Sequence, residues 1–185
     1  MYDYYPFDKD YDIYGDGSGV ETYEDLESQA DVVIKGRLDA DAKREIYVEC
    51  VLSHMEVDEC YKGNLGSGDQ ISIFEPINCT GIKDCLLCAE GYAPMTENTE
   101  YIMYLRRVKN SLFGSDKYIY IPASIRYGKF KANRETPKLF STSEFDDVKT
   151  INYQKYKDNE IFLFKKKDFH IYMLLKEAAW SATQL

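Results

Sequence analysis

The residues of this chain best suited to chemistry are its five cysteines and one of its two histidines. Cys85 and Cys88 have the CxxC spacing of tetrahedral zinc sites, and Cys79 and His54 are the candidates for the third and fourth ligands. The sequence contains no second CxxC pair and no closely spaced histidine pair, so it carries half of a zinc motif. A redox role is less favoured, because a redox CxxC normally begins a helix. Zinc therefore remains the alternative to disulfide bonding.

Disulfide bonding is the favoured use of these cysteines, although their odd number leaves at least one outside any bridge within the chain. Cys50 and Cys60 lie on one predicted strand, which would separate them by roughly 33 Å if it were straight, far beyond the ~7 Å limit for a bridge. A return of the chain about Gly66 places Cys79 opposite residue 53 and therefore close to Cys50. We expect a bridge from Cys50 to the loop that follows the third strand, with Cys60 as the buried remaining thiol. The disulfide candidates are Cys50, Cys79, Cys85 and Cys88.

Catalysis by other side chains has little support in the sequence. Neither His54 nor His170 has a sequence neighbour that would complete a dyad of nucleophile and base. Carboxylate pairs such as Glu56 and Asp58 are common in a chain with 32 acidic residues, and they are typical of a solvated face. We therefore predict that the protein is not an enzyme and binds no cofactor.

The elements that would position these residues are mostly strands. Runs rich in β-branched and aromatic residues, bounded by turn residues, predict five strands at 32–38, 46–61, 70–75, 100–108 and 117–130. The second is longer than an ordinary strand, so we expect it to bend through a bulge. A helix capped by Asp168 follows, and its apolar residues fall on two faces, so it should pack over the barrel. The predicted fold class is mainly β, a five-stranded antiparallel OB-like barrel with a C-terminal helix.

Four segments between residues 30 and 131 resemble a known module. They read ADVVIKGRL, YVECVLSHMEVDECYKGNLGSGDQISI, ENTEYIMYL and YIYIPASIRYGKF, and together they look like the netrin-type barrel. Tissue inhibitors of metalloproteinases share that module, as do many proteins of Gram-positive bacterial surfaces. The resemblance implies a secreted or surface-tethered bacterial domain. It does not imply protease inhibition, because the inhibitors chelate zinc with an amino-terminal cysteine and the first cysteine here is Cys50.

Charge divides the chain into an acidic arm and a nearly neutral body. Residues 1–27 hold nine acidic residues against Lys9, which accounts for most of the net charge of −9. The only basic run is Lys165 to Lys167, so we predict no nucleic-acid binding. No stretch of about 18 apolar residues exists, so we predict no membrane span. The expected organisation is an arm at 1–21, a barrel at 22–140 and a C-terminal segment at 141–185.

The arm also contains a partial calcium-loop pattern. Asp10, Asp12, Gly15 and Glu21 match positions 1, 3, 6 and 12 of an EF-hand loop, but Tyr14 stands where a ligand belongs. We therefore favour a solvated acidic linker. The arm is acidic and rich in tyrosine and is not a signal peptide. We expect an extracellular or surface-anchored protein, and its leader would then lie outside this sequence. Thr22 with Asp25 predicts a capped helical turn after the arm.

Tyrosines supply the candidate binding surface. Tyr118 and Tyr120 alternate with Ile119 and Ile121, so we expect the isoleucines to face the core and the tyrosines to face outward, where they could stack on sugar rings or a peptide. Cross-strand tyrosine pairing that supports the sheet is the alternative. The predicted function is a non-catalytic binding module for an unknown protein or glycan at the cell surface. The alternative is a zinc-binding or thiol-dependent protein centred on residues 79–88.

Overall fold

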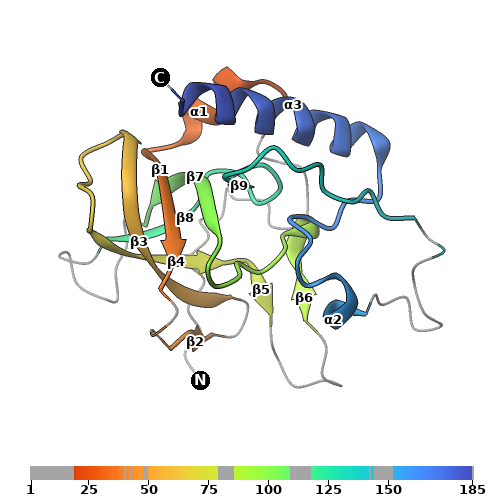
Figure 1. Cartoon of the computed structure of the whole chain (residues 1–185), viewed down its shortest axis with the longest axis horizontal. Coiled ribbons are helices and arrows are strands. Elements are labelled where there is room, and N and C mark those ends of the chain that lie inside the picture. The colour runs from red at the N-terminus through yellow and green to blue at the C-terminus, as the bar shows by residue number, and fades with distance from the viewer. Residues whose placement is uncertain are drawn as a thin grey trace.

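A closed barrel of five strands forms the body of the structure (Figure 1). The computed structural model describes residues 19–39, 41, 43–47, 50–78, 86–108, 118–141, 143 and 152–184. In order around the barrel, the strands are β1 (Val32–Leu38), β3 (Val51–Lys62), β4 (Gln70–Glu75), β8 (Ile119–Pro122) and β7 (Glu100–Arg107). Antiparallel pairing of β7 with β1 closes the ring. The mainly β class with an OB-like barrel is therefore confirmed.

The prediction that every strand pair would be antiparallel is wrong. β4 and β8 run parallel, with Ser72 beside Ile119 and Ile73 beside Tyr120, whereas the other pairs of the ring are antiparallel. The reason is geometric, because a closed ring with an odd number of strands cannot alternate direction at every step. The barrel is therefore mixed.

Two predicted strands are each divided in the structure. The run from 46 to 61 is a short strand β2 (Glu45–Ile46) that turns back onto β3, and the backbone N–H of Tyr47 donates to the carbonyl of Cys50 in that turn. The run from 117 to 130 is β8 followed, after a bend, by β9 (Lys129–Lys131). Both β8 and β9 pair with β7, at successive positions along it. The prediction of one long last strand is therefore wrong. The long bulged second strand is confirmed as β3, whose pairing with β1 contains register shifts, but it begins at Val51 and not at residue 46.

Smaller elements occupy the excursion between β4 and β7 and the approach to the last helix. They are β5 (Ile77–Asn78), β6 (Leu87–Cys88), the 3-10 turn η1 (Ala89–Gly91) and the helix α2 (Tyr153–Tyr156). An isolated bridge joins Tyr92 to Ile161, and the backbone N–H of Phe162 donates to the carbonyl of Gly91. The segments 89–93 and 160–163 therefore lie side by side.

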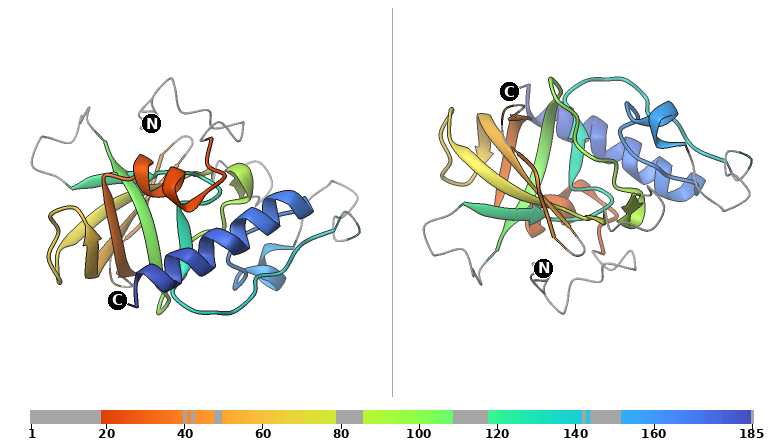
Figure 2. Two further views of the ribbon diagram at one scale, coloured as in Figure 1. Left: turned by 90° about the horizontal axis from the view of Figure 1, so that it is seen from above. Right: turned by 90° about the horizontal axis from the view of Figure 1, so that it is seen from below.

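Two helices cover one side of the barrel (Figure 2). The first, α1 (Tyr23–Gln29), begins with the predicted capping box, in which Thr22 Oγ1 accepts from the Asp25 N–H and the Asp25 carboxylate accepts from the Thr22 N–H. The second, α3 (Lys166–Ala182), is the predicted C-terminal helix. Its N-cap is Lys165, so the assignment of that role to Asp168 is wrong. None of the described helices is long and apolar enough to cross a bilayer.

The apolar side chains form two main layers. One fills the barrel and includes Ile34, Met55 and Met103. The other lies between the outside of β1 and β7 and the two helices, and it includes Val20, Tyr104 and Leu175. The buried face of α3 consists of Tyr172, Leu175, Lys176 and Ala179, whereas Leu174 is 57% exposed. The predicted packing of this helix over the barrel is therefore confirmed, although Leu174 faces solvent and the buried face contains a lysine.

Candidate functional site

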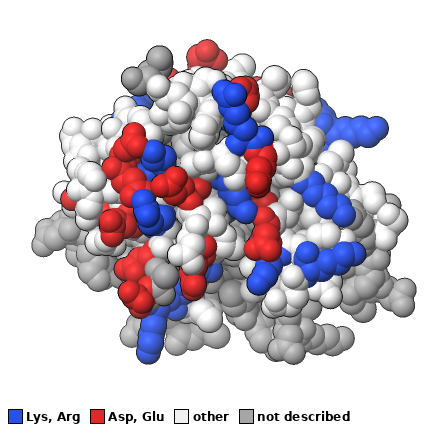
Figure 3. Space-filling view, viewed as in Figure 1, with Lys and Arg blue, Asp and Glu red and all other residues white. Residues whose placement is uncertain are grey.

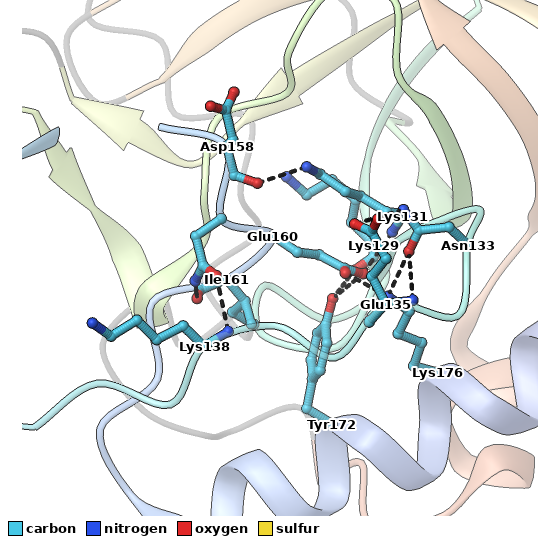
Figure 4. A network of polar contacts seen from close by, with 11 residues as sticks. Lys129, Lys131, Asn133, Glu135, Lys138, Asp158, Glu160, Ile161, Tyr172 and Lys176 are labelled. Carbon is cyan, nitrogen blue, oxygen red and sulfur yellow. Dashed lines mark hydrogen bonds and ion pairs between the residues drawn. The ribbon is translucent and has the colours of Figure 1, made fainter. Parts of the chain in front are cut away.

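A buried polar network joins α3 to the barrel (Figure 4). At its centre, Glu160 Oε2 lies 2.6 Å from Lys176 Nζ, and each of these side chains is 4% exposed. The other carboxylate oxygen, Oε1, accepts from the Tyr172 hydroxyl at 2.7 Å and from the Lys131 backbone N–H at 2.6 Å. Both oxygens of Glu160 are therefore satisfied by groups of α3 and β9.

The ammonium of Lys176 is also fully satisfied. Besides Glu160, it donates to the carbonyl of Glu135 at 2.8 Å and to Asn133 Oδ1 at 3.2 Å. Three acceptors match the three protons of an ammonium. Because burial of a charge is costly unless it is both paired and hydrogen-bonded, this geometry explains why a lysine can occupy the inner face of α3.

Lys129 is a second buried lysine in the same region, and its surroundings differ. Its ammonium donates to the carbonyl of Ala93 and lies 4.0 Å from the centroid of the Tyr92 ring and 5.2 Å from that of Tyr101. Burial lowers the pKa of Lys129 from its ordinary 10.5 to about 8, and the negative charges of Glu75 and Glu160 oppose this shift.

Glu75 is the second buried carboxylate, at the end of β4. It accepts from the Ser53 hydroxyl at 2.5 Å and from the Met95 backbone N–H at 2.7 Å, and Arg44 Nη2 lies 3.7 Å away. Burial, reinforced by the nearby negative charge of Glu75, raises the pKa of Tyr92 well above its ordinary value. The two carboxylates and two lysines therefore place compensating charges within the core.

Sequence reasoning did not single out these ionisable residues. Glu160 precedes the apolar run IFLF, and Lys176 follows Leu175 on the inner face of α3, so each was a charged residue within an apolar pattern. That pattern was the available signal. The pairing itself could not be read, because sequence spacing does not place the segment before α3 beside the middle of α3.

The structure tests only some of the cysteine predictions. Cys79 and Cys85 lie outside the described residues. Cys50 is buried against the outer side of the β3, β4 and β8 strands, whereas Cys88 packs near Ile77, and no disulfide joins cysteines of the described ranges. Residue 53 pairs with Ile73, so the register that placed Cys79 opposite it is wrong. The observed pairs, from Val51 with Glu75 to Glu56 with Gln70, centre the connection between β3 and β4 on Gly63 and not on Gly66, because β3 continues to Lys62 before the chain turns.

The remaining candidate ligands have other partners, and His54 Nδ1 lies 3.0 Å from the Ser72 hydroxyl. Cys60, the expected buried thiol, is only partly buried, and its Sγ donates to the carbonyl of Lys62 at 3.2 Å. Glu21 pairs with Lys167 at 3.4 Å on the surface. The calcium-loop residues Asp10, Asp12 and Gly15 lie outside the described residues. Within the ranges that the structure describes, no group of three or more His, Cys, Asp and Glu side chains could hold a metal ion.

The two candidate binding tyrosines have opposite environments. Tyr120 is 3% exposed and packs inside the barrel, while Ile119 and Ile121 are buried on its outer side, so the predicted orientation of this strand is wrong for Tyr120. Both faces of β8 are buried, so alternation alone could not identify the barrel interior. Tyr118 is 46% exposed, and the guanidinium carbon of Arg107 lies 5.5 Å from the centroid of its ring.

Charges on the outer face of β1 and β3 are interspersed and paired (Figure 3). Arg37 Nη2 lies 2.8 Å from Asp58 and 3.4 Å from Glu100, and Lys35 pairs with Glu59. Two features of the described residues combine an aromatic ring with an exposed guanidinium group: Tyr118 with Arg107 at 5.5 Å, and Trp180 with Arg134 at 6.0 Å. Of the two rings, that of Tyr118 is the more exposed. No protein-family model matches the chain, and no curated protein matches it in sequence.

Proposed function

We propose that this protein is a binding module without catalytic activity, which recognises a protein or glycan ligand through Tyr118 and Arg107. The observation that carries the proposal is the exposed Tyr118 ring with the Arg107 guanidinium beside it. A tyrosine ring offers a flat apolar face and a polar tip, which suits sugar rings and peptide side chains. A guanidinium group offers several donors in a fixed plane, which suits carboxylate and carbonyl acceptors.

The position of these two residues favours recognition. Tyr118 directly precedes β8, and Arg107 is the last residue of β7, two strands that pair through Arg107 and Tyr120. The Arg107 backbone N–H also donates to the Asp31 carboxylate at 2.8 Å. A side chain held by a rigid sheet loses little freedom on binding, which favours affinity.

The buried ionisable residues support the absence of catalysis. Glu75, Lys129, Glu160 and Lys176 are at most 5% exposed. A general acid or base must come within hydrogen-bond reach of its substrate. These four side chains are occupied by groups of the protein itself, so their most direct role is to hold the fold together.

We also propose that the protein acts outside the cell or on its surface. The support for this compartment is the resemblance of residues 30–131 to the netrin-type module and the number of cysteines. A thiol count on native protein tests it, because an oxidising compartment favours bridged cysteines.

The experiment is a screen of fluorescently labelled protein on a glycan array and on a peptide array. Tyr118→Ala is the test variant, and Ile46→Ala is the matched control, since Ile46 is 67% exposed on β2. We expect the wild type and the control to bind the same small set of ligands, and we expect Tyr118→Ala to lose binding to them. Equal binding by all three proteins, or conversion of a bound ligand into a product seen by mass spectrometry, would contradict the proposal.

A further inference from the structure

The side-chain amide of Asn133 lies against the amine end of Lys176 in the buried polar network (Figure 4). Lys176 Nζ is 3.2 Å from Asn133 Oδ1 and 2.6 Å from Glu160 Oε2. Three groups that together can form an amide bond are therefore in contact. They are a primary amine, a carboxamide that can acylate it, and a carboxylate that can carry protons between the two. A lysine amine is a nucleophile towards a carbonyl carbon once it is uncharged.

Glu160 is placed to take a proton from Lys176. Their separation of 2.6 Å falls within the hydrogen-bond reach of about 2.6–3.2 Å that a general base requires. Because a low-dielectric interior disfavours charge, transfer of one proton across this contact replaces a buried ion pair by an uncharged amine and an uncharged acid. The Tyr172 hydroxyl and the Lys131 backbone N–H bind the other oxygen of Glu160, so the carboxyl group keeps its orientation during the transfer.

The side-chain carbonyl of Asn133 is polarised for attack. Its oxygen accepts from the Glu135 backbone N–H at 3.1 Å in addition to Lys176. A fixed backbone donor on this oxygen stabilises the negative charge that develops there when an amine adds to the carbon. Since Cγ is bonded to Oδ1, the amine is within a small side-chain adjustment of the ~3–3.5 Å separation from which it can react. The amide nitrogen, which must leave, donates to Glu135 Oε2 at 3.5 Å.

We propose that Lys176 and Asn133 join in a covalent amide bond between their side chains, with Glu160 as the catalytic residue. Glu160 takes a proton from Lys176 Nζ, and the neutral amine adds to Asn133 Cγ, which forms the new C–N bond. Glu160 then gives its proton to Asn133 Nδ2 and accepts one from Nζ, the bond between Cγ and Nδ2 breaks, and ammonia leaves. The ammonia takes the proton that Glu160 holds and departs as ammonium, which restores the carboxylate. The step consumes no oxidant, cofactor or second substrate.

The bond ties α3 to the segment that follows β9. Asn133 lies two residues beyond the end of β9, and Lys176 belongs to the buried face of α3. The link closes a loop from residue 133 to residue 176, and a covalently closed loop reduces the conformational freedom of the unfolded chain. The reaction occurs once in each molecule, between groups that already touch. It is therefore independent of ligand recognition at Tyr118 and needs no access for a substrate.

The experiment is the intact mass of the purified and then denatured full chain, followed by mass spectrometry of its proteolytic peptides. We expect the wild type to be lighter than its sequence by one ammonia, and one branched peptide to join residue 133 to residue 176. Asn133→Asp keeps the shape of the side chain and should lose one water in place of one ammonia, because a carboxylic acid releases water when it forms the same bond.

Three further variants separate the bond from other losses of mass. Asn133→Ala removes the carbonyl carbon and Glu160→Gln removes the proton carrier, so both should keep the full mass of their sequences. Lys131→Met is the matched control, because the Lys131 ammonium donates to a backbone carbonyl, that of Asp158. This control should lose one ammonia like the wild type.

A wild type with the full mass of its sequence would overturn the proposal, and this measurement decides the matter even if a variant fails to fold. A branched peptide that joins other residues would also overturn it. So would loss of ammonia without a branched peptide, because an asparagine that cyclises onto its own backbone gives that result. Loss of ammonia from Asn133→Ala would likewise show that residue 133 is not the acyl donor.

Discussion

Glu160 Oε2 and Lys176 Nζ form an ion pair at 2.6 Å, and each of the two side chains is only 4% exposed. One partner precedes α3 in the chain and the other lies in its buried face, so the pair fixes how the helix sits on the barrel. Replacement of such a pair by apolar groups is often tolerated, whereas removal of one partner leaves an uncompensated buried charge.

Glu160→Gln tests this interpretation, because it keeps the shape of the side chain and removes its charge. We expect the free energy of unfolding to fall by about 3–5 kcal/mol, since the Lys176 ammonium stays buried without a counterion. Glu177→Gln is the control, because Glu177 pairs with Arg134 at 4.0 Å on the exposed face, where such pairs contribute about 1 kcal/mol at most. Urea unfolding measures both, and similar losses for the two variants would refute the role of the buried pair.

Alkaline pH should unfold the protein through its buried tyrosines. Burial, together with Glu160, raises the pKa of Tyr172 well above its ordinary value of 10.0, and burial also raises that of Tyr104. A group with a raised folded pKa contributes stability that is fully present below the unfolded value, here near 10, and is lost as pH rises beyond it. We expect tyrosine absorbance at 295 nm and loss of circular dichroism to change together. Ionisation of all tyrosines near pH 10 in a protein that stays folded would contradict this.

Gly91 occupies a position where a side chain does not fit. Its φ is +79°, and an added Cβ would lie 2.4 Å from the Phe162 carbonyl oxygen, because the two backbones pair there. Gly68 has a φ of +87° with nothing within 4 Å of such a Cβ, so Gly68→Ala isolates the backbone cost. We expect Gly91→Ala to lose about 2 kcal/mol more than Gly68→Ala in thermal or urea unfolding. Equal losses of unfolding free energy in the two variants would contradict this prediction, because they would mean that segment 160–163 can move away from residue 91 at no energetic cost.

The cysteines give a prediction that depends on the compartment. The observed register pairs Val51 with Glu75, which still leaves Cys50 beside the start of the loop that holds Cys79, Cys85 and Cys88. If the protein is extracellular, Cys50 should form a bridge to that loop, and Cys50→Ser should cost oxidised protein about 2–5 kcal/mol. Cys60→Ser should have the same effect in oxidised and reduced protein, because its thiol donates to a backbone carbonyl. Mass spectrometry of unreduced peptides checks the pairing, and five free thiols after oxidising purification would weaken the extracellular proposal.

Strand positions could be predicted where turn residues bound them. The bounds of β1 and β4 agree with the predicted 32–38 and 70–75, because Gly66 and Gly68 mark the turn before β4 and the runs are short. The turn between β2 and β3 escaped prediction, because Tyr47 and Cys50 are not turn residues and the flanking pattern continues through them.

The inner and outer faces of the barrel could not be predicted from alternation. Tyr120 lies inside, and Ile119 and Ile121 are buried outside, because other parts of the chain cover that outer face. The buried ion pair could not be predicted either, since Glu160 and Lys176 become neighbours only when α3 packs on the barrel. The exposure of Tyr118 was predicted correctly. The position of Arg107 beside its ring could not be predicted, because cross-strand neighbours depend on register.

The most direct test of the proposed function is the affinity of the strongest array ligand, measured by isothermal titration calorimetry. Tyr118→Ala should raise its Kd at least tenfold, which corresponds to about 1.4 kcal/mol, as expected for loss of an aromatic anchor. Arg107→Lys should also weaken binding, because a lysine keeps the charge but lacks the planar group. Ile46→Ala should bind within about twofold of the wild type, since single exposed apolar residues carry little binding energy. An unchanged Kd in Tyr118→Ala would contradict the account.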